Sequence, residues 1–250
     1  MSWAGAEMAQ KPLKPQLQLY LAQDRCGWLD ASGVAHWDEE GDFDSRLVRC
    51  VEAAAKAWPR RGLRRTPVQV WVSGGLCRPF LLGPVAGLKG ADEVRSFAQS
   101  QVADATGWDQ PCEVRFEGDV TKGVVLATAM PTAVHARIEA VMAGAQLRLV
   151  SLRPWWAGAL NQALQQQADL KMVVIDEPES LALLAGQGDD WDLADVFAPR
   201  PSADEAIRTV HRLAAGGSVQ PEQSAWLRLG AGSAGALWPA AEPVQFGGQA

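Results

Sequence analysis

The sequence has few of the residues that build metal, redox or hydrolytic sites. Its 250 residues include four cysteines, Cys26, Cys50, Cys77 and Cys112, and none of them has CxxC spacing. This pattern disfavours a zinc site and a thioredoxin-like motif, and it predicts reduced thiols, with Cys77 a buried one. We therefore predict no bound metal ion.

Histidine is equally scarce. The three histidines, His36, His135 and His211, are far apart in the sequence. His135 and His211 fall on predicted helices, where no serine or cysteine with a carboxylate partner can be placed beside them. Exposed or capping histidines are therefore predicted rather than a catalytic one.

The chain also lacks an excess of positive charge and a long apolar run. Its net charge of -6 gives no general attraction to nucleic acid. The one basic cluster, at residues 60–65, predicts a solvated loop, with anionic lipid or an acidic partner as alternatives. No stretch approaches the roughly 18 apolar residues that span a bilayer, and residues 1–15 lack a segment of secretory length. We expect a cytoplasmic protein without direct membrane insertion, peripheral at the inner membrane only through partners.

What the chain does have is apolar periodicity. With 48% hydrophobic residues it can bury a sizeable core. Alternation in residues 16–22 predicts a half-buried strand that forms an opening hairpin with a strand near residues 27–30. Further strands are expected at 112–117, 123–129, 147–152 and 225–229, and as a pair within 170–185 joined at 177–179.

Apolar residues at helical spacing predict five helices. They are expected at 45–58, capped by Asp44, at 91–106, from a Thr132 cap onward, at 154–166 and at 203–214. Residues 186–201, rich in Gly, Asp and Pro, are interpreted as a loop. Mixed sheets with flanking helices follow, hence an α/β or α+β fold.

The stretch VQVWVSGGLCRPFLLGP, residues 68–84, places Ser73, Gly74 and Gly75 between two apolar runs. A phosphate loop fed by a strand should lead into a helix. Here Pro79 and an extended apolar run follow instead. The stretch therefore favours the turn of a hairpin over an anion site.

The order of elements resembles that of the actin-like proteins of type IV pilus and type II secretion machines, PilM and the cytoplasmic part of GspL. The resemblance lies in VWVSGGLCRPFLLGP (residues 70–84) and GVVLATAMPTAVHARIEAVMAGAQLRLVSL (residues 123–152). The opening GWLDASG, residues 27–33, is closer to GspL. The similarity covers about residues 16–185.

The resemblance implies a reduced actin-like (ASKHA or PilM-like) fold with a full first domain and a truncated second domain. The first domain would span residues 16–168, with an inserted subdomain at about 85–152, and the second residues 169–230. Disordered tails are expected at residues 1–15 and 231–250.

Actin-like ATPases carry an Asp-x-Gly turn in each half to hold phosphates and magnesium. The candidate turns here are Asp24 with Gly27 and Asp176 with Glu177. At the second turn Pro178 and glutamates replace glycine and hydroxyl residues, and two carboxylates would repel a polyphosphate unless a metal intervened. We predict no cofactor, with ATP and magnesium as the alternative.

The same carboxylates admit other uses. Asp176, Glu177 and Glu179 could form an acid/base pair or bind a divalent cation. A charged β-turn is the commoner use of such a segment and is the interpretation preferred here.

Eleven tryptophans offer anchors for a partner. Trp71 is expected in the core and Trp37, beside three acidic residues, at the surface. An acidic loop next to an aromatic ring suits a basic peptide. The resemblance implies a binding surface formed by the sheet and helices of the first domain, and the partner-binding residues expected on it are Trp28, Trp37, Asp38 and Arg78.

Together with the resemblance, these features predict a non-catalytic scaffold of a pilus or secretion assembly. It would bind the cytoplasmic segment of an inner-membrane component, or the assembly ATPase, and could form a homodimer through the second unit. A nucleotide-binding actin-like ATPase is the alternative, followed by a small-molecule enzyme of unknown chemistry.

Overall fold

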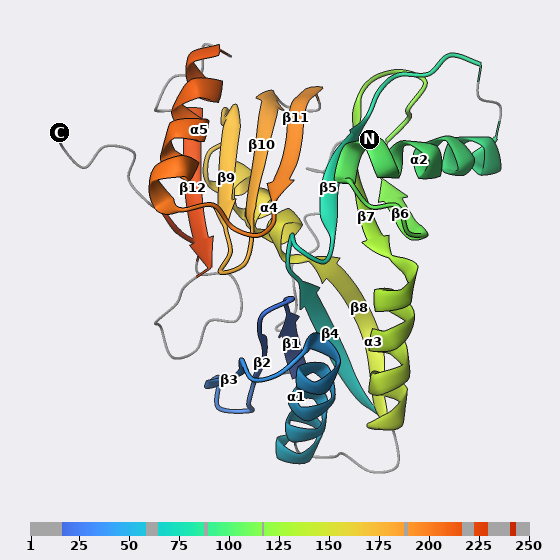
Figure 1. Cartoon of the computed structure of the whole chain (residues 1–250), viewed down its shortest axis with the longest axis vertical. Helices are drawn as coiled ribbons and strands as arrows, with labels where there is room; N and C mark the ends of the chain where they lie inside the picture. Colours follow the sequence, from blue (N-terminus) through green and yellow to red (C-terminus); the bar gives the residue numbers. More distant parts are fainter. Residues whose placement is uncertain are drawn as a thin grey trace.

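A computed structural model describes residues 17–58, 65–87, 90–116, 118–187, 190–216, 223–229 and 241–243 (Figure 1). The first sheet has the order β3 (Ala35–Asp38), β2 (Cys26–Leu29), β1 (Leu17–Leu21), β4 (Thr66–Val72) and β8 (Leu147–Pro154). β1 and β2 pair antiparallel, which confirms the opening hairpin, and β1, β4 and β8 run parallel.

The second sheet repeats this arrangement. Its order is β11 (Asp190–Phe197), β10 (Leu181–Gln187), β9 (Met172–Asp176), β12 (Ser224–Leu229) and β13 (Ala241–Pro243). As in the first sheet, a meander of three antiparallel strands is followed by a strand parallel to its first member, here β12 beside β9. The two sheets therefore share the arrangement of four strands and differ at the fifth, because β8 runs parallel to β4 whereas β13 pairs antiparallel with β12.

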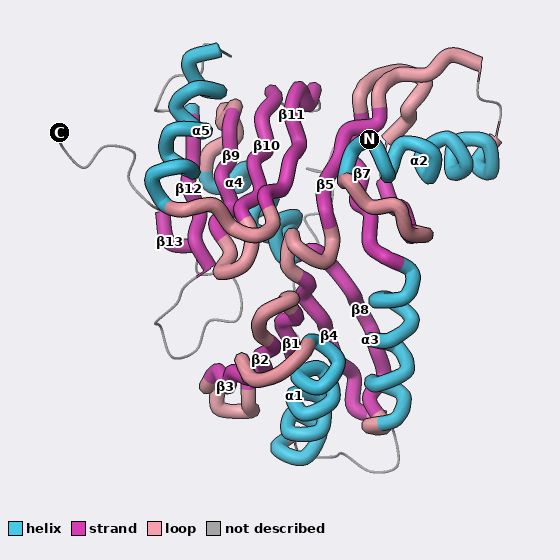
Figure 2. The backbone as a smooth tube through the Cα atoms, in the orientation of Figure 1, coloured by secondary structure: helices cyan, strands magenta, loops and turns pink. Residues whose placement is uncertain are grey.

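A small antiparallel sheet completes the strands. It has the order β5 (Arg78–Leu82), β7 (Val125–Pro131) and β6 (Cys112–Phe116), and α2 (Ala91–Thr106) covers it through Ala98 and Val102. In Figures 1 and 2 the small sheet stands beside the second sheet, and both lie above the first.

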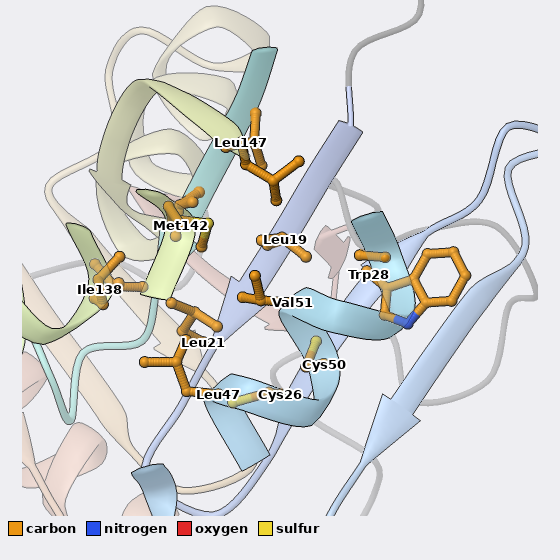
Figure 3. Close-up of a cluster of buried hydrophobic side chains, with 14 of the residues drawn as sticks. Leu19, Leu21, Cys26, Trp28, Leu47, Cys50, Val51, Ile138, Met142 and Leu147 are labelled. Atoms are coloured by element: carbon orange, nitrogen blue, oxygen red, sulfur yellow. The ribbon is translucent and has the colours of Figure 1, made fainter. Parts of the chain in front are cut away.

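Two helices cover one face of the first sheet. Leucines on alternate positions of β1, Leu19 and Leu21, point toward α1 (Phe43–Ala57) and α3 (Thr132–Gly144), where they meet Val51 and Ile138 (Figure 3). Because Tyr20 points to the opposite, equally buried face, β1 is buried on both sides and not half-buried as the alternation suggested.

The opposite face of the first sheet packs against α4 (Trp155–Gln166), which joins it to the second sheet. Tyr20 and Trp71 from the first sheet, Trp156 from α4 and Ile175 from β9 belong to one buried cluster. Trp71 is thus in the core, as predicted. The far face of the second sheet is covered by α5 (Ala203–Gly216). The mixed sheets with flanking helices confirm the predicted α/β class.

The hairpin prediction for residues 68–84 is wrong. β4 belongs to the first sheet and β5 to the small sheet, so the two strands do not pair. Residues 73–77 form a tight turn in which the N–H groups of Leu76 and Cys77 donate to the Ser73 carbonyl. The chain uses this turn to pass from one sheet to the other.

The loop prediction for residues 186–201 is also wrong, because β11 pairs along its length with β10. The helix caps differ as well. Asp42, not Asp44, caps α1, its side chain accepting a 2.8 Å hydrogen bond from the Ser45 N–H. Pro131, not Thr132, precedes α3.

Other predictions fall outside the described residues. These are the tail at residues 1–15, most of the tail at residues 231–250, and residues 60–64 of the basic cluster. The division into domains stays a prediction. Within the part of the chain that the structure describes, no helix is long and apolar enough to cross a membrane.

Candidate functional site

Three turns from distant parts of the sequence meet between the first and second sheets. They are the β1–β2 turn at Asp24, the glycine loop (residues 73–75) after β4, and the turn between β9 and β10. We call the last the carboxyl turn (residues 177–179). Its two glutamates reach into the first sheet, where they contact donors from both of the other turns.

Glu177 is the more deeply buried of the two glutamates, with 1% of its surface exposed. Its Oε2 accepts a 2.6 Å hydrogen bond from the Tyr20 hydroxyl, and its Oε1 accepts a 2.8 Å bond from the Gly74 N–H. The predicted charged turn is therefore present between β9 and β10, and its first glutamate is buried.

Glu179 completes the set of contacts. Its Oε1 accepts a hydrogen bond from the Ser73 hydroxyl, and its Oε2 accepts a 2.8 Å bond from the Asp24 N–H. Each of the four carboxyl oxygens of the turn thus has a donor from β1 or from the turns that follow β1 and β4. Backbone N–H groups and hydroxyls converging in this way are what oxyanion sites in proteins are made of.

The two glycines of the glycine loop allow this close approach. A Cβ placed on Gly75 would lie 2.6 Å from Glu179 Oε1, and one on Gly74 would lie 3.1 Å from Glu177 Oε1. Neither glycine has the left-handed backbone that favours the residue, so the space taken by the carboxyl groups explains them.

Burial dominates the protonation of this site. It raises the pKa of Glu177 to about 8, although the hydrogen bonds from Tyr20 and Gly74 oppose the shift. Burial also raises the pKa of Glu179, and burial followed by the charge of Glu177 raises the pKa of Tyr20 well above its ordinary value. At neutral pH the carboxyl group of Glu177 is therefore mostly protonated.

Asp176 lies at the end of β9 but serves a different purpose. Only 2% exposed, it accepts bonds of 2.5 and 3.0 Å from Arg200 and 2.9 Å from Arg228. Burial would raise its pKa, yet the hydrogen bonds from the two arginines outweigh that effect and lower it. The carboxylate of this predicted nucleotide turn is thus used in an internal ion pair.

The residues of the other predicted nucleotide turn are also engaged. Asp24 gives its N–H to Glu179, and its side chain lies 3.6 Å from Arg25. Gly27 lies beneath the Trp37 ring, where an added Cβ would meet ring carbon Cε3 at 2.6 Å. Among the described residues, no group of three or more His, Cys, Asp and Glu side chains could hold a metal ion.

The predicted partner-binding residues fall in two places. Trp37, 39% exposed, lies with Asp38 along a groove of about 800 Å³ between the β2–β3 hairpin and α1, which we call the acidic groove. Trp28 is only 8% exposed, and its ring stacks on that of His36 with the ring centroids 4.3 Å apart. Arg49 donates two 2.8 Å bonds to Asp38.

Arg78 is not part of this groove. It lies on β5, where its Cζ atom is 4.7 Å from the centroid of the Trp108 ring. Its guanidinium group donates a 2.5 Å hydrogen bond to the Thr106 carbonyl. Burial lowers its pKa. The structure therefore brings three of the four predicted residues together and leaves Arg78 on the small sheet.

The acidic groove and the carboxyl turn are linked through aromatic rings. Trp37 packs edge-on against Tyr20 with centroids 5.9 Å apart, and Tyr20 holds Glu177. Sequence reasoning missed Tyr20, Arg200 and Arg228. The apolar strands flanking the carboxyl turn on both sides were the one available signal that its glutamates are buried.

No protein-family model matches the chain, and no curated protein matches its sequence. Solved structures do resemble it. A Bacteroides thetaiotaomicron protein with an actin-like ATPase fold and unknown function superposes with a TM-score of 0.57 at 9% identity, covering 87% of this chain and 82% of that one.

Two further structures come from secretion and pilus machines. The PilM–PilN type IV pilus biogenesis complex has a TM-score of 0.52 at 14% identity, covering 81% of this chain and 66% of that one. The cytoplasmic domain of EpsL, an inner-membrane component of the Vibrio cholerae type II secretion system, has a TM-score of 0.50 at 8% identity, covering 85% and 81%.

At these identities the likeness concerns the fold and carries no site residue with it. Each match extends over more than four fifths of this chain. The chain has the actin-like fold that its resemblance to PilM and the cytoplasmic part of GspL implied.

Proposed function

We propose that the chain is a non-catalytic adaptor of actin-like fold that binds a protein partner in a type IV pilus or type II secretion assembly. The observation that carries this proposal is the occupation of the cleft between the sheets. The donors that an anionic ligand would need, at Asp24, Ser73 and Gly74, are bonded to Glu177 and Glu179. A nucleotide would have to displace two buried carboxyl groups.

Titration of the purified chain with ATP and magnesium tests the non-catalytic part. We expect no binding heat and no hydrolysis, since phosphates beside these glutamates would meet both occupied donors and negative charge. Magnesium-dependent ATP binding at micromolar concentrations would overturn the proposal in favour of the actin-like ATPase alternative.

The partner would be the cytoplasmic segment of an inner-membrane component, or the assembly ATPase, which places the adaptor in the cytoplasm at the membrane face. The acidic groove supports this choice. Its exposed ring, Trp37, offers apolar area, and Glu39 and Glu40 beside it attract a basic segment. Because Asp38 is already paired with Arg49, and Glu39 lies 3.1 Å from Arg25, Glu40 carries most of the attraction.

Pulldown from cells, with identification of the recovered membrane proteins, tests this surface. We expect a pilus or secretion component with the wild type and its loss with E39K/E40K. The matched control, D104K/D109K, makes the same charge change at exposed positions away from the groove. Recovery of no such component, or equal recovery by all three proteins, would contradict the proposal.

A homodimer through the second unit is a further part of the proposal. β13, an outer strand of the second sheet, pairs on one side only among the described residues, whereas β11, the other outer strand, lies against β5 of the small sheet. Exposed strand edges are common sites of association. Analytical ultracentrifugation showing a monomer at high concentration would remove this part.

A further inference from the structure

The strand β3 lies at one edge of the first sheet. It pairs with β2, and among the described residues no second strand pairs with its other side. Figures 1 and 2 show β3 at the outer side of the sheet, next to β2. Its four residues, AHWD, include neither a lysine nor a proline, which commonly protect strand edges. The edge is therefore open to pairing with another chain.

The hairpin fixes which backbone groups of β3 point outward. At the turn between β2 and β3, the Asp30 N–H donates a 3.0 Å hydrogen bond to the Val34 carbonyl. Bonded and non-bonded pairs alternate along an antiparallel ladder, so the next residue of β3 that bonds to β2 is His36. Ala35 and Trp37 therefore direct their N–H and carbonyl groups away from β2, where an added strand could bond to them.

The two faces of β3 differ in chemistry. His36 and Asp38 point to the face that α1 covers, and Asp38 bonds there to Arg49 of this helix. Trp37 points to the opposite face, where its ring meets Tyr20 edge-on. A strand added at about 4.8 Å from β3 would direct alternate side chains toward these two faces. One set would face the acidic groove, and the other would lie against the Trp37 ring.

The charge around the acidic groove favours a basic segment. Residues 24–49, which include the β2–β3 hairpin and the first half of α1, contain seven aspartates and glutamates and three arginines. Two of these arginines, Arg25 and Arg49, are paired with Glu39 and Asp38. The remaining charge is negative and complements lysine or arginine side chains. Trp37 is 39% exposed and offers apolar area to the residues between them.

We propose that β3 binds the partner's basic segment as an added strand, in which basic side chains facing the acidic groove alternate with apolar side chains against Trp37. The backbone groups of Ala35 and Trp37 supply affinity, and the alternating pattern supplies specificity. This inference rests on the proposed function, which assigns a basic segment to the acidic groove, and it adds the conformation and residue pattern of that segment.

The first test uses the wild-type chain and two labelled peptides of the same composition, KVKVKVK and KKKKVVV. Fluorescence anisotropy at physiological ionic strength measures their affinities. We expect KVKVKVK to bind at least about tenfold more tightly, because only the alternating peptide places all its lysines on one face of a strand. Equal affinities would mean that charge alone explains the binding, and would overturn the inference.

Backbone N-methylation of KVKVKVK tests the strand itself. An added strand directs alternate N–H groups toward β3, so methylating those amides removes up to two hydrogen bonds and should weaken binding at least about tenfold. Methylating the other set, whose N–H groups face away from β3, should change binding little. Sensitivity at the valines indicates an antiparallel strand, and sensitivity at the lysines a parallel one. Equal effects of the two sets, whether both peptides bind or neither does, would overturn the inference.

The charge variants separate this inference from the proposed function. We expect E39K/E40K to lose KVKVKVK binding and D104K/D109K to retain it. If so, and if the two methylated peptides behave alike, the groove holds a basic segment in another conformation and only the inference is overturned. Equal KVKVKVK binding by all three proteins would place the peptide elsewhere and also overturn it. Recovery of no pilus or secretion component in the pulldown would instead overturn the proposed function.

Discussion

The hydroxyl of Tyr20 donates a 2.6 Å hydrogen bond to Oε2 of Glu177, a residue 157 positions further along the chain. Both side chains are buried, with at most 1% of their surface exposed. The bond joins the first strand of the first sheet to the end of the first strand of the second. It is therefore a direct link between the two halves of the fold.

Replacing Tyr20 with phenylalanine removes this donor and little else. We expect Y20F to lower the free energy of unfolding by about 1–3 kcal/mol, because a buried carboxyl oxygen loses its hydrogen bond. Urea denaturation measures the change. In an E177A background the same substitution should cost much less, and an equal cost in both backgrounds would show that the bond contributes nothing.

Stability should also depend on pH through Glu177. The folded pKa is about 8 and the ordinary value is 4.5, so between these values the folded chain holds a proton that the unfolded chain has released. The free energy of unfolding should therefore fall as the pH rises from about 4.5 to about 8. The charge of Glu179 adds to the effect, whereas the hydrogen bonds from Tyr20, Gly74 and Ser180 oppose it.

The variant E177Q isolates this contribution. Urea denaturation of wild type and E177Q at intervals from pH 5 to pH 8.5 should show a smaller decline for the variant. Parallel curves for the two proteins would mean that Glu177 titrates near its ordinary pKa despite its burial.

Local sequence patterns were sufficient to predict some of the helices and strands. The helix predicted at residues 91–106 is α2 to the residue, because Gly107 in a left-handed conformation with φ of 72° ends it directly after the periodic segment. β11 was missed because residues 190–197 contain three aspartates, a residue type depleted in strands, and their extended form depends on pairing with β10.

The candidate functional site was also missed because it depends on contacts between distant parts of the chain. The sequence raised both an anion loop at residues 73–75 and paired carboxyl groups at residues 177–179, and it disfavoured each. What joins them is the packing of two sheets from distant parts of the chain, which also buries the turn. A local pattern contains no record of such a contact, so the sequence predicted a charged turn but not the burial of its glutamates.

The buried ion pair of Asp176 should contribute more to the free energy of unfolding than a similar pair at the surface. We expect D176N to cost about 3 kcal/mol of unfolding free energy, because Arg200 and Arg228 would both lose their charged acceptor. The matched control is D38N, which breaks a comparable arginine pair whose aspartate is 21% exposed. Its cost should stay below about 1 kcal/mol, and equal costs in urea denaturation would contradict the importance of burial.

Gly75 tests whether Glu179 is held in place. In G75A the new Cβ would lie 2.6 Å from Glu179 Oε1, so the carboxyl group must move and give up its bonds to Ser73 and Asp24. We expect a loss of about 1–2 kcal/mol in unfolding free energy, or about 1 kcal/mol for each bond. The control G83A adds a Cβ with no atom within 4 Å and should be close to neutral.

The double variant G75A/E179A separates a steric effect on Glu179 from a general effect on the backbone. With the glutamate truncated, the added methyl group has space, so G75A should cost no more there than G83A does in the wild type. If G75A is neutral in the wild type, Glu179 moves aside freely and its two hydrogen bonds contribute little. If its cost persists in the E179A background, Gly75 is needed for backbone freedom instead of for the approach of the carboxyl turn.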